Sequence, residues 1–178
     1  FENVELKAKI TKMAEAVLDK DAVFGSNTST LPITGLAEAS ERPENFIGIH
    51  FFSPVERMGL VEIISGEKTS EATLAKAVDY VLAIRKTPIA VNDSRGFYTS
   101  RCFGTYTREG MEMLAEGIKP AIIENVGRQS GMPMGPLEVS DSVGLDTALK
   151  VTRATAEAAG IDLQTDDRTQ FLAWLVED

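Results

Sequence analysis

Residues 46–64 read Phe-Ile-Gly-Ile-His-Phe-Phe-Ser-Pro-Val-Glu-Arg-Met-Gly-Leu-Val-Glu-Ile-Ile. This stretch decides the fold because two apolar runs, 46–52 and 60–64, lie on either side of a turn that contains a proline. Short apolar runs bounded by turn residues are typical of buried strands, and proline fixes φ and cannot donate to a strand ladder. We therefore predict two strands that follow one another in the chain, with a break at Ser53-Pro54.

The two predicted strands carry one polar residue each that could do chemistry. His50, the only histidine, lies near the end of the first strand, and Glu62 lies in the middle of the second. An ionised carboxylate in an apolar strand is unfavourable without a partner, and the imidazole of His50 is the nearest candidate. Taken singly, a lone histidine is more often structural and a strand glutamate often faces water. Taken together, the two residues predict a histidine oriented by a carboxylate, which is a common form of general base near neutral pH.

Outward from this stretch, helical periodicity alternates with short apolar runs. The pattern predicts helices over 3–19, 33–40 and 70–85, and further strands over 21–25 and 87–92. This alternation is typical of an α/β layer with a parallel or mixed sheet. The small polar residues 26–30 follow a strand, so they form either a helix cap or a ligand-binding loop.

Two of these helices are predicted to cover the core with one apolar face each. The first helix would use Leu6, Ile10, Met13, Val17 and Leu18, and the helix over 70–85 would use Leu74, Val78, Val81 and Leu82.

No strand-like run follows Ser94, and every later segment has helical character. Helices are predicted over 96–116, 120–130, 137–143 and 146–159, with a last apolar patch over 171–176. We therefore expect two domains, 1–93 and 94–178. The helix over 96–116 carries so many large apolar side chains that we expect the helical domain to form a dimer.

Composition excludes several classes of function. The 178 residues have a net charge of −9 and show no basic cluster, which disfavours nucleic acid and anionic membrane surfaces as partners. The single cysteine excludes an intrachain disulfide, and one histidine without an HExxH or CxxC motif disfavours a zinc site. No apolar run approaches the roughly 20 residues needed to span a bilayer.

Several segments, in order along the chain, resemble the 3-hydroxyacyl-CoA dehydrogenase family, most closely the dehydrogenase part of multifunctional fatty-acid β-oxidation α-subunits. The segments are Ser26–Ser29, Gly48–Val55, Leu60–Ile63, Gly96–Arg101, Met134–Glu138 and Asp141–Asp146. The resemblance implies α/β followed by all-α: the C-terminal part of a Rossmann-like NAD-binding domain, then a helical dimerisation domain.

The resemblance also implies roles for individual residues. His50 would be the catalytic base, Glu62 its orienting partner, and Ser29 the residue that hydrogen-bonds the substrate oxygen. Asn27 matches a residue on the nicotinamide side of the cofactor.

Other matches concern ligand binding alone. Glu2 and Lys7 fall where the family contacts the ribose and nicotinamide of NAD. Ser53 and Ser100 match substrate-binding positions at which many members carry Asn; serine or threonine there is more similar to the multifunctional α-subunits.

The resemblance further implies an acyl-CoA substrate, a homodimer, an enoyl-CoA hydratase domain in the same polypeptide and a thiolase subunit as partner. Its location would be cytoplasmic in a bacterium or the mitochondrial matrix in a eukaryote. The sequence has no G-x-G-x-x-G, which the family carries upstream, so we expect the chain to be an inactive fragment that binds NAD no better than millimolar. Two alternatives remain: a short-chain 3-hydroxybutyryl-CoA enzyme, and a family member recruited to a structural, crystallin-like role.

Overall fold

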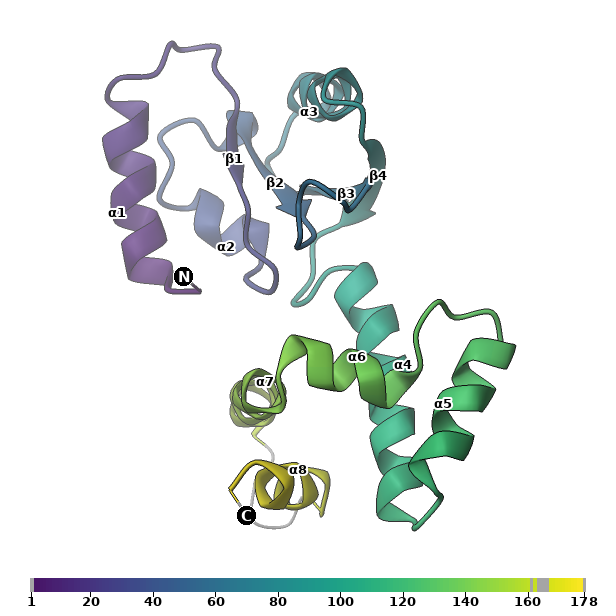
Figure 1. The fold of residues 1–178 in the computed structure, drawn as a ribbon. Coiled ribbons are helices and arrows are strands. Elements are labelled where there is room, and N and C mark those ends of the chain that lie inside the picture. The colour runs from purple at the N-terminus through teal and green to yellow at the C-terminus, as the bar shows by residue number, and fades with distance from the viewer. Residues whose placement is uncertain (1, 161, 163–166, 178) are drawn as a thin grey trace. The chain divides into compact units, whose positions relative to one another are not determined.

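The first part of the chain contains a mixed four-stranded sheet in the order β1-β2-β3-β4 (Figure 1). The structure is a computed structural model and describes residues 2–160, 162 and 167–177. β1 runs parallel to β2, β2 antiparallel to β3, and β3 parallel to β4. The strands are β1 (Phe24–Ser26), β2 (Phe46–Phe51), β3 (Leu60–Ser65) and β4 (Thr87–Asn92). Both strands expected in residues 46–64 are therefore confirmed.

Helices cover both faces of this sheet because its strands alternate in side-chain direction. The helices of this part are α1 (Val4–Glu15), α2 (Ile33–Ala37) and α3 (Glu71–Ala83), and Pro43–Asn45 form one 3-10 turn. On one face, Ile47, Val61 and Ile63 pack with Ala77 and Val81 of α3. On the other face, a second buried cluster joins α2 to the sheet; it consists of Ile33, Leu36, Ala37, Phe46, Ile64 and Phe97.

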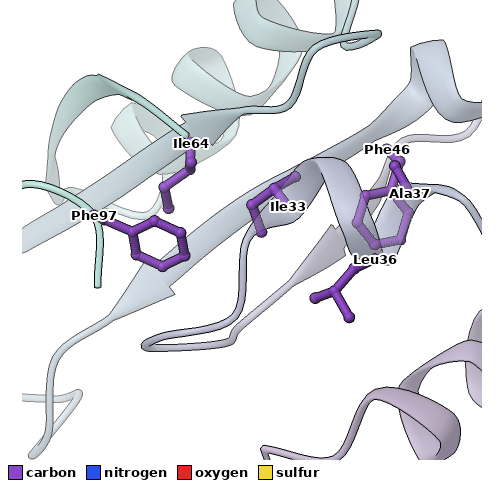
Figure 2. Packing of buried hydrophobic residues seen from close by; sticks show 6 residues of the cluster. All are labelled: Ile33, Leu36, Ala37, Phe46, Ile64 and Phe97. Carbon is purple, nitrogen blue, oxygen red and sulfur yellow. The ribbon is translucent and has the colours of Figure 1, made fainter. Parts of the chain in front are cut away.

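Figure 2 shows how the second cluster is arranged, with Ile33 between the Phe97 ring and the side chains of Leu36 and Phe46. Gly48 makes this packing possible, since a Cβ at that position would lie 2.7 Å from Ile33 Cδ1. α2 itself has no capping side chain at its own N-terminus. Instead Asp93, far along the chain, accepts hydrogen bonds at 2.8 Å from the backbone N–H groups of Ile33 and Thr34.

The predicted buried face of the first helix is wrong, and that of the helix over 70–85 is confirmed except at Leu82. α1 ends at Glu15 rather than at residue 19, and its only buried residue is Thr11. Leu6, Ile10, Met13, Val17 and Leu18 are all exposed, from 39% to 84%. The reason is that no other element among the described residues covers that face. On α3, Val81 is buried and Leu74 and Val78 pack against the same cluster, as predicted, but Leu82 is exposed.

Only helices follow β4 in the part of the chain that the structure describes. They are α4 (Thr99–Ala115), α5 (Pro120–Gln129), α6 (Pro136–Val143), α7 (Leu145–Ala159) and α8 (Asp167–Glu177). The expected sequence of α/β structure followed by all-α structure is thus confirmed. The chain packs as two compact units, Phe1–Cys102 and Phe103–Asp178.

α4 begins three residues later than the prediction from residue 96. Gly96 has φ +75° and Phe97 has φ +46°, so both lie in the left-handed region and cannot continue a helix. Phe97 is fully buried in the cluster of the first unit. Its ring therefore belongs to the core of the α/β part and not to a helix bundle.

In the second unit, three glycines allow α4, α5 and α6 to approach closely. A Cβ on Gly110 would collide with Pro136, a Cβ on Gly127 with the Tyr106 hydroxyl, and a Cβ on Gly135 with the Glu124 carboxylate. That carboxylate accepts hydrogen bonds from the first backbone N–H groups of α6, at 2.8 Å from Leu137 and 3.2 Å from Glu138. Arg128 forms ion pairs with both Glu124 and Glu138. In the segment Met134–Glu138, which resembles the family motif, the start of α6 is thus capped by Glu124 of α5.

Candidate active site

His50 and Glu62 are directly opposed in the antiparallel register of β2 and β3, and Phe46, Gly48 and His50 point to the same face as Glu62 and Ile64. Directly opposed residues share a face and lie close together. His50 Nδ1 is 2.8 Å from Glu62 Oε2, and the pair is buried: His50 is 7% exposed and Glu62 is 0% exposed. The hydrogen-bonded pair predicted from the two apolar runs is therefore confirmed.

The second oxygen of Glu62 has its own partners. Oε1 accepts hydrogen bonds from the backbone N–H groups of Tyr98, at 3.1 Å, and Thr99, at 2.8 Å, where α4 begins. Burial alone would raise the pKa of Glu62, but hydrogen bonds from His50 and from the Thr99 backbone outweigh it, so the pKa is lowered from its ordinary value of 4.5. Glu62 is thus an ionised carboxylate that accepts at both oxygens.

An ionised Glu62 fixes the tautomer of His50. A carboxylate can only accept hydrogen bonds, so Nδ1 must carry the proton that it shares with Oε2, and Nε2 is left with an acceptor lone pair. Aromatic rings flank the imidazole, since the Phe52 and Phe97 ring centroids lie 4.6 Å and 6.0 Å from that of His50. A buried imidazole with one free basic nitrogen can act as a general base.

A second polar cluster follows β1. Glu2 Oε2 accepts from the Thr28 hydroxyl at 2.5 Å, and Glu2 Oε1 accepts from the Ser29 N–H at 2.8 Å and the Ser29 hydroxyl at 2.9 Å. Burial would raise the pKa of Glu2, but the hydrogen bonds from Thr28 and Ser29, together with the charge of Lys7, lower it. The structure therefore brings two of the predicted site residues, Glu2 and Ser29, into direct contact.

Asn27 connects this cluster to β2. Its Oδ1 accepts a 2.9 Å hydrogen bond from the backbone N–H of Phe51, the residue after His50. Because β1 and β2 are parallel, the loop that follows β1 and the end of β2 lie at the same edge of the sheet. Asn27 and Lys7 also line one open cavity of about 180 Å³ between α1 and β1.

The two remaining predicted residues lie apart from these contacts. Ser53 is exposed in the turn after β2, and Ser100 is half-buried in the first turn of α4. In the part of the chain that the structure describes, neither is hydrogen-bonded to His50 or Glu62.

Sequence reasoning missed three contributors to the site. Thr28 is fully buried and binds Glu2, Phe97 packs beside His50, and the start of α4 binds Glu62. Thr28 is the central residue of the polar segment 26–30, so the sequence pattern could have identified it as a candidate site residue. The contacts of Phe97 with His50 and of α4 with Glu62 join residues far apart in the sequence, so no local sequence pattern predicts them.

Among the described residues, no group of three or more histidine, cysteine, aspartate and glutamate side chains could hold a metal ion. Within the same residues, every helix is too short or too polar to cross a membrane.

Comparison with known proteins gives two family matches and many relatives. Residues 1–94 match the 3-hydroxyacyl-CoA dehydrogenase NAD binding domain, and residues 96–175 match the C-terminal domain of the same family. The fatty acid oxidation complex subunit alpha of Shewanella loihica is 41% identical over 177 residues, which is 94% of this chain and 25% of that protein. The subunit of Shewanella oneidensis is 40% identical over the same lengths. The chain thus spans about a quarter of the length of these curated relatives.

Solved structures agree with the sequence matches. The (S)-3-hydroxybutyryl-CoA dehydrogenase PaaH1 from Ralstonia eutropha has a TM-score of 0.88 at 34% identity, over 99% of this chain and 62% of that one. FadB2 from M. tuberculosis has a TM-score of 0.85 at 29% identity, over 99% and 63%. The α/β layer with its buried His50–Glu62 pair, the helices that follow it and the family matches over both parts lead to one conclusion: this chain belongs to the 3-hydroxyacyl-CoA dehydrogenase family.

Proposed function

We propose that the protein oxidises an (S)-3-hydroxyacyl-CoA to the 3-oxoacyl-CoA with NAD, and that His50 is the general base and Glu62 its orienting partner. The observation that carries this proposal is the buried contact of 2.8 Å between His50 Nδ1 and Glu62 Oε2, which leaves Nε2 free to accept a proton. Family membership supplies the class of reaction, and the pair supplies the group that the reaction needs.

In the proposed step, His50 Nε2 takes the proton of the 3-hydroxyl while the C3–H bond breaks with its electron pair and the C3–O bond becomes a carbonyl. When bound, NAD supplies the acceptor for that hydride. The imidazole becomes positively charged as the proton arrives, and the adjacent ionised Glu62 stabilises this charge more in the transition state than in the ground state. The rings of Phe52 and Phe97 limit the access of water to the imidazole.

The donor set near β1 fits the nicotinamide half of NAD. Asn27 uses its amide oxygen for Phe51, so its NH₂ group remains to donate, and Lys7 contributes a cation beside the same cavity. We propose that these two residues and the Glu2–Ser29 cluster lie on the nicotinamide side of the cofactor.

The relatives suggest further partners. Because the Shewanella relatives are named as subunits of a fatty acid oxidation complex, we propose a long polypeptide that also contains an enoyl-CoA hydratase domain and that binds a thiolase subunit. PaaH1 is named as a 3-hydroxybutyryl-CoA dehydrogenase, and this shorter substrate is the second candidate.

We also propose that the helical domain forms a homodimer. The supporting observation is a row of exposed apolar side chains on α5, where Ile122 and Val126 are each 53% exposed. These residues are four apart and lie on one face of the helix. Trp174 on α8 is also 56% exposed.

The activity is tested by following NADH formation with (S)-3-hydroxyacyl-CoA substrates of increasing chain length, using the protein in its natural full length. Turnover that increases with acyl chain length would support a role in fatty-acid oxidation. Turnover confined to the four-carbon substrate would support 3-hydroxybutyryl-CoA as the substrate. A folded protein that binds NAD but oxidises none of these substrates would contradict the proposal and would favour a structural role.

A further inference from the structure

The hydroxyl of Thr99, at the start of α4, is a buried polar group without a partner. Thr99 Oγ1 is shielded from solvent and forms no hydrogen bond with any residue that the structure describes. Buried polar side-chain atoms nearly always have a partner, because removing them from water without one is unfavourable. A lone hydroxyl at this position therefore needs a physical reason.

Helix capping does not supply that reason. A threonine at the start of a helix usually accepts a hydrogen bond from a backbone N–H of the first turn. Thr99 Oγ1 accepts none among the described residues, and the N–H of Cys102 donates to the carbonyl of Tyr98 at 3.0 Å. The backbone N–H of Thr99 itself donates to Glu62 Oε1 at 2.8 Å. Thr99 is thus tied to the carboxylate of Glu62 and not to a capping turn.

Glu62 has one acceptor position that no group in the described part of the chain fills. A carboxylate has about four such positions, two on each oxygen. Oε1 accepts from the two N–H groups at the start of α4, whereas Oε2 accepts from His50 alone. Glu62 is 0% exposed, so bulk water does not reach the open position on Oε2. Ile89, paired with Glu62 on the other neighbouring strand, is apolar and offers no donor.

The Thr99 hydroxyl already influences Glu62. Burial raises the pKa of Glu62, but hydrogen bonds from His50, from the Thr99 backbone and from the Thr99 side chain lower it, and His50 is the one titratable group among these causes. The hydroxyl is therefore near the carboxylate, although its alignment falls short of hydrogen-bond geometry. Hydrogen bonds around a catalytic base are often poorly aligned until the reacting groups are in place.

We propose that Thr99 is a positioning residue whose hydroxyl donates to the open acceptor position on Glu62 Oε2 and so fixes the carboxylate against His50. This inference rests on the proposed function, in which Glu62 orients the imidazole. Two N–H groups on Oε1 hold that oxygen but leave the carboxylate free to swing about it. A donor on Oε2 fixes the oxygen from which His50 takes its orientation, and small errors in orientation are costly for proton transfer.

The first test compares two substitutions at Thr99 in the full-length protein. Thr99→Val keeps the shape of the side chain and removes the donor, whereas Thr99→Ser keeps the donor. Loss of a donor makes Glu62 more basic, which alone would favour the charged imidazole, so a fall in kcat would report lost orientation. We expect Thr99→Val to lower kcat about three- to thirty-fold with little change in KM, and Thr99→Ser to stay within about two-fold of wild type.

Thermal unfolding of the same proteins gives a readout that needs no activity. Without the donor, the pKa of Glu62 rises toward 4.5, so the stabilisation that comes from its lowered pKa becomes smaller. That stabilisation is present above the unfolded pKa and is lost as the pH falls through the folded pKa. Thr99→Val should therefore have a lower Tm than wild type at neutral pH, and the difference should disappear on acidification.

Thr107→Val is the matched control, because it is the same substitution in the same helix. The Thr107 hydroxyl contacts the α4 carbonyls of Phe103 and Gly104, at 3.3 Å each. Thr107→Val should keep the wild-type kcat, and its effect on Tm should be the same at neutral and acidic pH.

A hydroxyl that truly lacks a partner predicts the opposite sign, because replacing it by a methyl group removes an unpaired buried donor. A Thr99→Val protein that is more stable than wild type at neutral pH and keeps its kcat would overturn the inference. Equal losses of kcat in Thr99→Val and Thr99→Ser would overturn it too, since they would assign the effect to packing. A wild-type protein that oxidises no 3-hydroxyacyl-CoA would overturn the proposed function, and the pH dependence of the Tm difference would still decide whether Thr99 binds Glu62.

Discussion

Glu62 holds His50 with one carboxylate oxygen and the first backbone N–H groups of α4 with the other. One side chain thus orients the imidazole and caps a helix. The two functions predict different consequences for kinetics and for stability, and each can be measured separately.

His50→Gln should lower kcat by about 10²- to 10⁴-fold and change KM little, because the proton transfer is needed mainly in the transition state. Steady-state kinetics on the full-length protein would measure both parameters. Turnover within a few-fold of wild type would show that the base lies elsewhere.

Glu62→Gln should reverse the tautomer of His50. The amide NH₂ can donate to Nδ1, which would place the imidazole proton on Nε2 and remove the free basic nitrogen. We expect kcat to fall by about 10²-fold or more with little change in KM, on the scale of general-base catalysis. NMR of the imidazole nitrogens would report the tautomer directly, and a protonated Nδ1 in the variant would contradict this explanation.

The lowered pKa of Glu62 also predicts a pH dependence of stability. Because the folded-state pKa lies below the unfolded value of 4.5, the folded state favours the ionised form. The resulting stabilisation is present above the unfolded pKa and is lost as the pH falls through the folded pKa. Thermal unfolding between neutral and acidic pH should therefore show a gap between wild type and Glu62→Gln that narrows on acidification. A gap that widens would reverse the sign and contradict the assignment.

Phe97→Ala should destabilise the α/β part by about 3–5 kcal/mol, the usual result of removing a fully buried aromatic ring. Urea unfolding would measure the loss. Phe103→Ala is a suitable comparison, because that ring is 41% exposed and should contribute much less. Equal losses from both substitutions would mean that Phe97 is not a core residue.

Glycine-to-alanine substitutions in the helical part should have opposite signs at two positions. Gly127→Ala should destabilise the protein, because its Cβ would collide with the Tyr106 hydroxyl and with Pro136. Gly104→Ala should stabilise α4 by up to about 1 kcal/mol, because nothing lies within 4 Å of a Cβ at that exposed helical position. Thermal unfolding of the two variants would test the contrast, and stabilisation by Gly127→Ala would contradict the close approach of α4 and α5.

Local sequence predicted the strands well because their signal is local. The break at Ser53-Pro54 between two apolar runs predicts two neighbouring strands with one polar residue each, and the register of β2 and β3 then places Glu62 opposite His50. The predicted helix start at residue 96 was wrong because the apolar Phe97 continues a helical sequence pattern. In the structure Phe97 is buried in the first unit with φ +46°, which a helix does not allow. That contact depends on α2 and β3, which lie far away in the sequence.

The site residues also divide into those that local sequence predicts and those that depend on long-range contacts. His50 and Glu62 could be paired from two neighbouring runs, whereas the role of Glu2 depended on a contact 27 residues away with Ser29. The residue type alone does not predict which partner receives the hydroxyl proton of a serine, because a hydroxyl donates or accepts according to its neighbours.

The location of Phe97 has a consequence for exchanging modules between related enzymes. The family matches meet between residues 94 and 96, but Phe97 fills the core of the first unit, and the N–H groups of Tyr98 and Thr99 bind Glu62. A chimera joined at residue 95 would therefore combine the core and the Glu62 carboxylate of one parent with the Phe97 ring and the start of α4 from another. A junction after Cys102, where the first compact unit ends, would keep both sets of contacts within one parent.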